Sequence, residues 1–134
     1  MTEEALHTIT EIDTIEANIS LKSNGIMYVL FKDNCMLDID LQLRMLDEYN
    51  KITNHKPTPF IFFAGDNVTV TKEARDNATL LEDRSPICAT AVVITSLAYK
   101  LIAEFYMKFN KPKHPYKIFK NEKDAVEWVK QFIS

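Results

Sequence analysis

The chain has 134 residues, of which 46% are hydrophobic, so it has the size and composition of one globular domain and not of a disordered chain. Its net charge of −3, from 16 basic and 19 acidic residues, lacks the basic excess that nucleic-acid-binding proteins carry. Its two glycines are too few for a phosphate-binding loop or a dinucleotide-binding fingerprint.

The sequence also lacks targeting signals. Residues 1–10 are polar and acidic, unlike a secretory leader, and no apolar run approaches the roughly 20 residues that span a bilayer. We therefore expect a cytoplasmic protein without a transmembrane segment. Cys35 and Cys88 match no metal-ligand spacing, and we expect both to be reduced thiols.

The first predicted elements form a hairpin. Residues 1–13 are expected to be a flexible lead-in. Residues 15–22 alternate between apolar and polar side chains, with Ile15 on the apolar side, and this pattern predicts a half-buried strand. Asn24-Gly25 then favours a tight turn, and residues 26–32 are rich in residues typical of a partner strand.

The middle of the chain alternates between helices and strands. Asp38 and Asp40 are typical helix-capping residues before an apolar-periodic helix over 41–53. Residues 59–64 form a continuous apolar run, which predicts a strand covered on both faces. Thr71 is expected to cap a helix that continues to about Asp83.

The last third continues the same alternation. Residues 87–95 predict a second buried strand, and a helix over 97–109 follows it. Residues 116–119 predict a short strand, and 121–124 resemble a capping box before a final helix to Phe132. The order ββαβαβαβα predicts one α/β domain with a mixed five-stranded sheet and four helices, its later strands being parallel.

This order resembles the STAS fold of anti-sigma-factor antagonists, and the residues resemble a bacterial family of small uncharacterised STAS-like proteins. The segments that carry the resemblance are Asn24-Gly25-Ile26, Thr71-Lys72-Glu73-Ala74-Arg75, Asn110-Lys111-Pro112 and the closing helix with Trp128. Together they cover roughly residues 15–133. The resemblance implies a non-enzymatic regulatory or protein-interaction module.

In anti-sigma-factor antagonists, a phosphorylated serine follows an aspartate at the start of the second helix, and its charge controls partner binding. The aspartate is kept here as Asp66, but Asn67 stands where the serine is expected. Thr69 and Thr71 supply nearby hydroxyls at a different spacing, and we interpret Thr71 as a helix cap.

The same loop is the predicted partner or ligand surface, because ligands of open α/β sheets gather beyond the carboxyl ends of the parallel strands. The helix that follows adds free N–H groups and a positive dipole end. The residues assigned to this surface are Asp66, Asn67, Thr69, Thr71, Lys72 and Arg75. The alternative is an ordinary capped loop in which Arg75 pairs with Asp76 or Glu82.

The predicted helix over 97–109 is apolar around most of its circumference. One stripe, Leu97, Leu101, Phe105 and Phe109, is expected to face the sheet. Further apolar surface comes from Tyr99, Ile102, Tyr106 and Met107. This second surface packs on another helix of the domain, forms a homodimer interface, or lines a pocket for a lipid or other apolar ligand.

We find no set of residues for catalysis or metal binding. The histidines, His7, His55 and His114, have no second histidine or cysteine at metal-ligand spacing. No serine or cysteine is paired in the sequence with a base that would activate it. We therefore expect no enzymatic activity, no cofactor and no metal.

Overall fold

A six-stranded mixed sheet forms the centre of the computed structural model, which describes residues 6–94, 97, 100–101, 104 and 112–133. In spatial order its strands are β1 (Thr8–Asp13), β2 (Ala17–Lys22), β3 (Met27–Phe31), β5 (Thr58–Ala64), β7 (Ile87–Val93) and β8 (Tyr116–Phe119). The β1–β2 and β2–β3 pairs are antiparallel, and β3, β5, β7 and β8 are parallel neighbours. This confirms the predicted mixed α/β sheet with parallel later strands.

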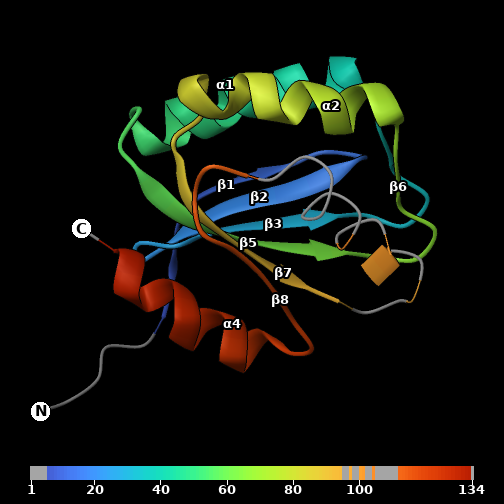
Figure 1. Ribbon diagram of the computed structural model, residues 1–134. Helices are drawn as coiled ribbons and strands as arrows, with labels where there is room; N and C mark the ends of the chain where they lie inside the picture. Colours follow the sequence, from blue (N-terminus) through green and yellow to red (C-terminus); the bar gives the residue numbers. More distant parts are fainter. Residues whose placement is uncertain (1–5, 95–96, 98–99, 102–103, 105–111, 134) are drawn as a thin grey trace, which may run out of the picture.

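Helices cover both faces of the sheet. Helices α1 (Ile39–Thr53) and α2 (Lys72–Leu81) lie over one face, and α4 (Glu122–Val129) lies under the other (Figure 1). Short 3₁₀ turns, Glu82–Arg84 and Lys130–Phe132, extend α2 and α4. The predicted helix over 97–109 lies largely outside the described residues.

The hairpin between β2 and β3 forms as its sequence predicts. Gly25 has a φ of 81°, in the left-handed region that glycine adopts without strain. The side chain of Asn24 supports the turn, because its Oδ1 accepts a hydrogen bond from the amide of Ile26 and its Nδ2 donates to the hydroxyl of Tyr28.

The two apolar runs are the inner strands β5 and β7, which confirms their prediction. Alternate side chains face opposite layers, since successive residues of a strand point to opposite faces. Phe60 packs beneath α1, where the ring of Tyr49 meets it edge-on at 4.9 Å between centroids. Ile61 belongs instead to the cluster with Val129 on the α4 side.

The N-terminal segment differs from its prediction. Residues 8–13, expected to be part of a flexible lead-in, form β1 and pair with β2, so the sheet has six strands where five were predicted. Ile15, expected on the apolar side of a strand, lies in the β1–β2 turn and is 93% exposed. The alternation that predicted one long strand continues through a turn, which periodicity alone does not reveal.

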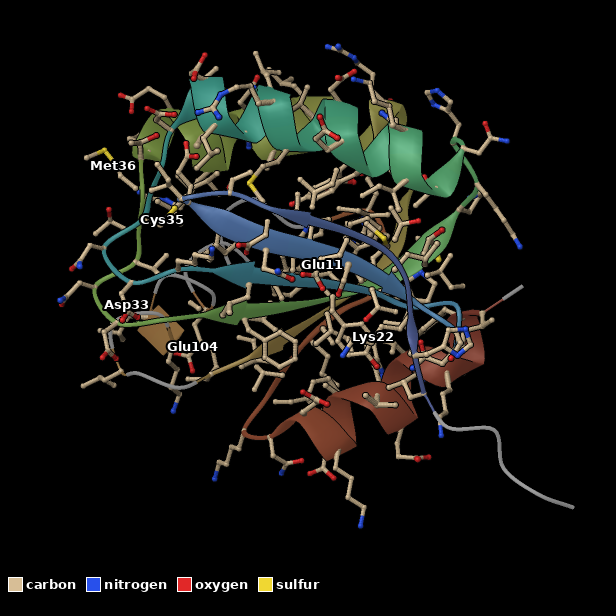
Figure 2. The ribbon with its side chains drawn as sticks, turned by 180° about the vertical axis from the view of Figure 1, so that it is seen from behind. Glu11, Lys22, Asp33, Cys35, Met36 and Glu104 are labelled. Atoms are coloured by element: carbon tan, nitrogen blue, oxygen red, sulfur yellow. The ribbon has the colours of Figure 1, made fainter. Side chains whose placement is uncertain are left out.

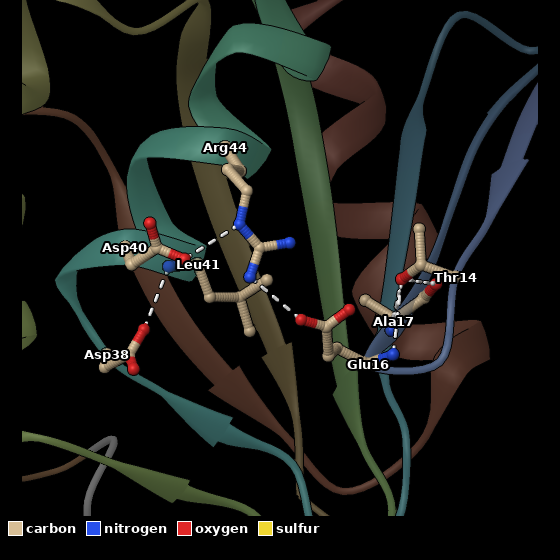
Figure 3. A network of polar contacts seen from close by, with 7 residues as sticks. All are labelled: Thr14, Glu16, Ala17, Asp38, Asp40, Leu41 and Arg44. Carbon is tan, nitrogen blue, oxygen red and sulfur yellow. Dashed lines mark hydrogen bonds and ion pairs between the residues drawn. The ribbon is translucent and has the colours of Figure 1, made fainter.

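The start of α1 also differs from its prediction in one detail. Asp38 is the N-cap and accepts a hydrogen bond from the amide of Leu41 at 2.9 Å, as predicted. Asp40, expected to be a capping residue, lies in the first turn and pairs with Arg44. Arg44 also reaches Glu16 at 2.9 Å and so connects α1 to the β1–β2 turn (Figure 3).

A second, two-stranded parallel sheet lies beside the main one. It consists of β4 (Met36–Leu37) and β6 (Thr69–Val70), which precede α1 and α2 respectively. These strands have two residues each, too few to show a period, and so were not predicted. In the part of the chain that the structure describes, no helix is both long and apolar enough to cross a membrane.

Candidate ligand-binding cavity

A cavity of about 210 Å³ lies between the sheet and the layer of α1 and α2. Most of its lining is apolar. The apolar side chains among the described residues are Phe31, Leu37, Met45, Leu46, Tyr49, Phe62, Val70, Ala74, Ala78, Leu81, Ile87 and Val92. The side chains with hydrogen-bonding groups that also line it include Gln42, Arg75, Glu82, Ser85, Thr90, His114 and Tyr116.

The helices form one wall through their inner faces. Helix α1 contributes Gln42, Met45 and Tyr49, spaced three and four residues apart, and α2 contributes Ala74 and Ala78 with the same spacing. Side chains at this spacing share one face of a helix. The two alanines are short, and they leave space where larger side chains would fill the gap between α2 and the sheet.

Gln42 joins the two helices at the cavity. Its Nε2 donates to the carbonyl oxygen of Ala74 at 2.7 Å, and its Oε1 accepts from Nδ2 of Asn77 at 2.9 Å. Both ends of the amide are therefore hydrogen-bonded within the protein. Gln42 therefore connects α1 to α2 beside the cavity.

Glu82 supplies a second polar group of the lining, directly after the end of α2. The Oε2 atom of Glu82 accepts a hydrogen bond from the amide of Lys113 at 2.9 Å. Its Oε1 atom is buried and has no hydrogen-bond partner among the residues that the structure describes. A buried oxygen without a donor is uncommon in folded proteins and calls for an explanation.

His114 lies in the same part of the lining. Its Nε2 atom is 2.8 Å from the hydroxyl of Thr90 on β7. Burial lowers the pKa of His114 below its ordinary value, and the negative charge of Glu82 partly opposes this shift. The imidazole is therefore neutral at pH 7.

The residues of the predicted partner surface lie in different places in the structure. Asp66 and Asn67 lie exposed at the loop after β5, next to the loop that follows β3 and contains the labelled Asp33 (Figure 2). The amide of Asp66 donates to Oδ1 of Asp33 at 2.7 Å, and Nδ2 of Asn67 donates to Oδ1 of Asn34 at 3.2 Å. This hydrogen-bonding fixes the shape of the loop.

The remaining residues of that surface have separate roles. Thr69 pairs with Met36 in the small sheet. Thr71 caps α2 by accepting a hydrogen bond from the amide of Ala74 at 3.1 Å, as predicted. Lys72 forms an ion pair with Asp76 at 2.7 Å, on the exposed side of the helix.

Arg75 does not belong to the loop surface. Its Nη1 atom donates to the carbonyl oxygen of Val70 at 2.8 Å, and the side chain lines the cavity. The sequence placed Arg75 beside Asp66 because they are close along the chain. Asp66 lies in the loop before the helix. Arg75 lies on the inner face of α2, which also carries Ala74 and Ala78 and lines the cavity.

The other predicted surface lies mostly outside the described residues, which include none of Tyr99, Ile102, Tyr106 and Met107. Of the stripe expected to face the sheet, Leu97 is 71% exposed and Leu101 is 57% exposed. The expectation is therefore wrong for these two residues, because the apolar period shows that a stripe exists without showing what covers it.

Three residues that line the cavity were not predicted as site residues: Gln42, Glu82 and His114. They come from three elements that lie far apart along the chain, and no local motif connects them. Among the described residues, no group of three or more His, Cys, Asp or Glu side chains could hold a metal ion.

Comparisons with known proteins support the fold. The crystal structure of an uncharacterised protein of the DUF3478 family from Shewanella loihica PV-4, described as having a SpoIIAA-like fold, is similar with a TM-score of 0.55. The two sequences are 11% identical over 96% of this chain and 98% of that chain. No curated protein sequence matches the chain.

The SpoIIAA-like fold is the STAS-like fold. The resemblance inferred from the sequence is therefore confirmed at the level of the fold. The model of one protein family, a domain of unknown function, matches residues 19–133, which is most of the chain. The chain belongs to this family, DUF7793.

Proposed function

We propose that this domain is a non-enzymatic binding module that holds a small, largely apolar ligand in the cavity between the sheet and helices α1 and α2. The cavity itself carries the proposal. Its volume of about 210 Å³ exceeds the roughly 150 Å³ of an engineered cavity that holds one benzene molecule. Its lining of apolar side chains with a few polar groups is typical of ligand sites.

The contact between Thr90 and His114 is the arrangement nearest to a catalytic pair. A nucleophilic hydroxyl needs a base, and the base needs a third group that orients it. Glu82 does not supply that group, because its Oε2 bonds to the amide of Lys113 and its Oε1 has no partner among the described residues. Thr90 is also 5% exposed. These features support a structural role for the pair.

Binding of a fluorescent apolar probe tests the proposal. N-phenyl-1-naphthylamine is weakly fluorescent in water and should brighten on entering the cavity. The variant Ala78→Leu places a larger side chain into the cavity and should weaken probe binding at least tenfold. Glu73→Leu is the matched control, because Glu73 lies on the exposed side of α2, and it should bind the probe like the wild type.

Equal probe binding by Ala78→Leu and the wild type would mean that the probe lies elsewhere on the surface. No saturable probe binding by the wild type would contradict the proposal outright. Native mass spectrometry of protein purified from its own host provides a second readout, since a retained ligand adds a discrete mass.

A regulatory protein-interaction role, with homodimer formation, is the second candidate. Two observations favour it: Asp66 and Asn67 are exposed on a loop of fixed shape, and Leu97 and Leu101 expose apolar surface. We expect Asp66→Ala with Lys72→Ala to weaken binding of a protein partner, and Leu97→Glu with Leu101→Glu to shift a dimer to monomer in light scattering. Unchanged partner capture and mass in these variants would contradict this role.

A further inference from the structure

A second cavity, of about 200 Å³, lies between helix α1 and strands β1 and β2. We infer that it forms one binding site with the first cavity, that the ligand is a molecule with a single long, unbranched alkyl chain, and that the side chain of Met45 separates the two halves of this site. The inference rests on the proposed function, because it extends the same cavity and names the class of its ligand.

Helix α1 lines the two cavities with two adjoining faces. The second cavity is lined by the α1 residues Leu41, Arg44, Met45, Asp47 and Glu48. The first cavity is lined by the α1 residues Gln42, Met45, Leu46 and Tyr49. Apart from Asp47, each set has the three- and four-residue spacing of one helical face. Among the described residues, Met45 alone lines both cavities, so it lies where the two faces of α1 meet.

The floors of the two cavities belong to one row of side chains across the sheet. The members of this row are Cα partners on successive strands, Ile12, Ile19, Val29, Phe62 and Val92. The first two line the second cavity, and the last two line the first cavity. Neighbouring strands lie about 4.8 Å apart, so the row extends over about 19 Å from β1 to β7. Only Val29, in the middle of the row, lines neither cavity.

The barrier between the cavities includes a side chain that can move. Met45 and Val29 are buried and belong to the same apolar cluster. Methionine is unbranched, has three rotatable side-chain bonds and adapts to irregular spaces. Because a cavity adjoins Met45 on each side, its side chain has room to change rotamer. Such a change opens a passage over the sheet without a movement of α1.

The combined volume sets the length of the chain that fits. An engineered cavity of roughly 150 Å³ holds one benzene molecule, and by this measure the first cavity holds about eight carbon atoms. The second cavity raises the capacity to about 16 carbon atoms. A passage opened by one side chain is narrow, so it admits an unbranched chain and excludes a ring system.

The second cavity also offers a place for a polar headgroup. Its lining includes Arg44 and Asp47, whose side chains are largely exposed. Arg44 reaches from α1 to Glu16 in the β1–β2 turn (Figure 3). A ligand that enters beside these residues keeps its headgroup in water while its chain extends under α1.

A series of alcohols of increasing chain length tests the inference. Hexanol, octanol, decanol and dodecanol each compete with N-phenyl-1-naphthylamine for the wild-type protein, below their solubility limits. Each further buried methylene group should raise the affinity about threefold. If the chain passes Met45, this gain continues beyond about eight carbon atoms, and dodecanol binds at least about tenfold more tightly than octanol. A smaller gain would overturn the inference and leave the proposed function intact.

The variant Ile12→Trp fills the second cavity from β1, and Ile12 does not line the first cavity. The advantage of dodecanol over octanol should fall below about threefold, because its last methylene groups are no longer buried. Octanol should bind as it does to the wild type, which also shows that the variant is folded. Ile9→Trp is the matched control, since Ile9 is 58% exposed on the same strand and lines neither cavity. An unchanged advantage of dodecanol in Ile12→Trp would contradict the inference.

A further measurement does not depend on a variant. Wild-type protein with ¹³C-labelled isoleucine methyl groups carries a reporter in each cavity, Ile87 in the first and Ile19 in the second. One equivalent of dodecanol should give nuclear Overhauser cross-peaks to both. Cross-peaks to only one of them would overturn the inference. Failure of every alcohol and of the fluorescent probe to bind would overturn the proposed function as well.

Discussion

Gly65 lies against Asp33 so closely that no side chain fits between them. A Cβ atom at position 65 would fall 2.9 Å from the backbone nitrogen of Asp33 and closer still to its Oδ1 atom. That Oδ1 atom accepts a hydrogen bond from the amide of Asp66. The contact holds together the loops that follow β3 and β5, from which the chain enters β4 and β6 and then the two helices that cover the cavity.

The first prediction concerns this contact. Gly65→Ala should lower the free energy of unfolding by about 1–3 kcal/mol, the usual cost of forcing an extra group into a filled space. Urea denaturation measures the change. In an Asp33→Ala background, the same substitution should cost less, because the closest clash is with the Asp33 side chain. Equal costs in the two backgrounds would contradict this account.

The second prediction concerns the N-cap of α2. Thr71→Ala should cost about 1 kcal/mol, since the amide of Ala74 loses its side-chain acceptor. Thr71→Ser and Thr71→Asp should retain most of the stability, because both side chains also cap helices. Thr69→Ala is the neighbouring control, exposed on β6. The assignment of Thr71 as a cap would be wrong if the two alanine variants were equally stable.

The third prediction concerns pH. The folded-state pKa of His114 is lowered by burial from the ordinary value of 6.5, so the unfolded chain takes up a proton first as the pH falls. Stability from this residue is therefore complete well above pH 6.5 and is lost as the pH falls below it. Urea denaturation from pH 7.5 to 5.5 should show this loss.

The matching variants isolate the contribution of His114. His114→Gln should remove part of the pH dependence over that range, whereas His55→Gln, at an exposed position, should retain it. An unaltered dependence in His114→Gln would show that His114 is not protected from protonation in the folded protein.

The fourth prediction concerns β1, which the sequence had placed in a flexible segment. Its pairing with β2, for example Glu11 opposite Ser20 and Ile12 opposite Ile19, should protect alternate backbone amides of residues 8–13 from hydrogen exchange. Residues of a flexible segment would exchange within the dead time of the experiment, and that outcome would remove β1 from the sheet.

Local signals predicted the elements of the central sheet correctly except for β1. The turn at Asn24-Gly25, the apolar runs of β5 and β7, and the caps at Asp38, Thr71 and Asn121 each act within a few residues. β1 was missed because residues 8–13 are largely exposed and therefore carry no burial pattern. Such a strand is defined by its partner β2, and the pairing is not encoded in a short window.

The cavity could not be predicted because, like the pairing of β1 with β2, it brings together residues that lie far apart in the sequence. Gln42, Glu82 and His114 reach it from α1, the end of α2 and the segment before β8, and each has an ordinary sequence neighbourhood. His114 stands beside a proline, and no second histidine or cysteine lies at metal-ligand spacing from it. The predicted loop surface follows the carboxyl end of β5, but one of its members, Arg75, lines the cavity because helical geometry places it on the inner face of α2.

The most direct test of the central claim is an isotope-filtered nuclear Overhauser experiment on protein saturated with octanol. If the cavity holds the ligand, protons of the octyl chain should show cross-peaks to side chains that line it on separate elements, Met45 of α1, Leu81 of α2 and Val92 of β7. Cross-peaks confined to exposed residues such as Leu80 and Leu97, with none to these three, would contradict the claim.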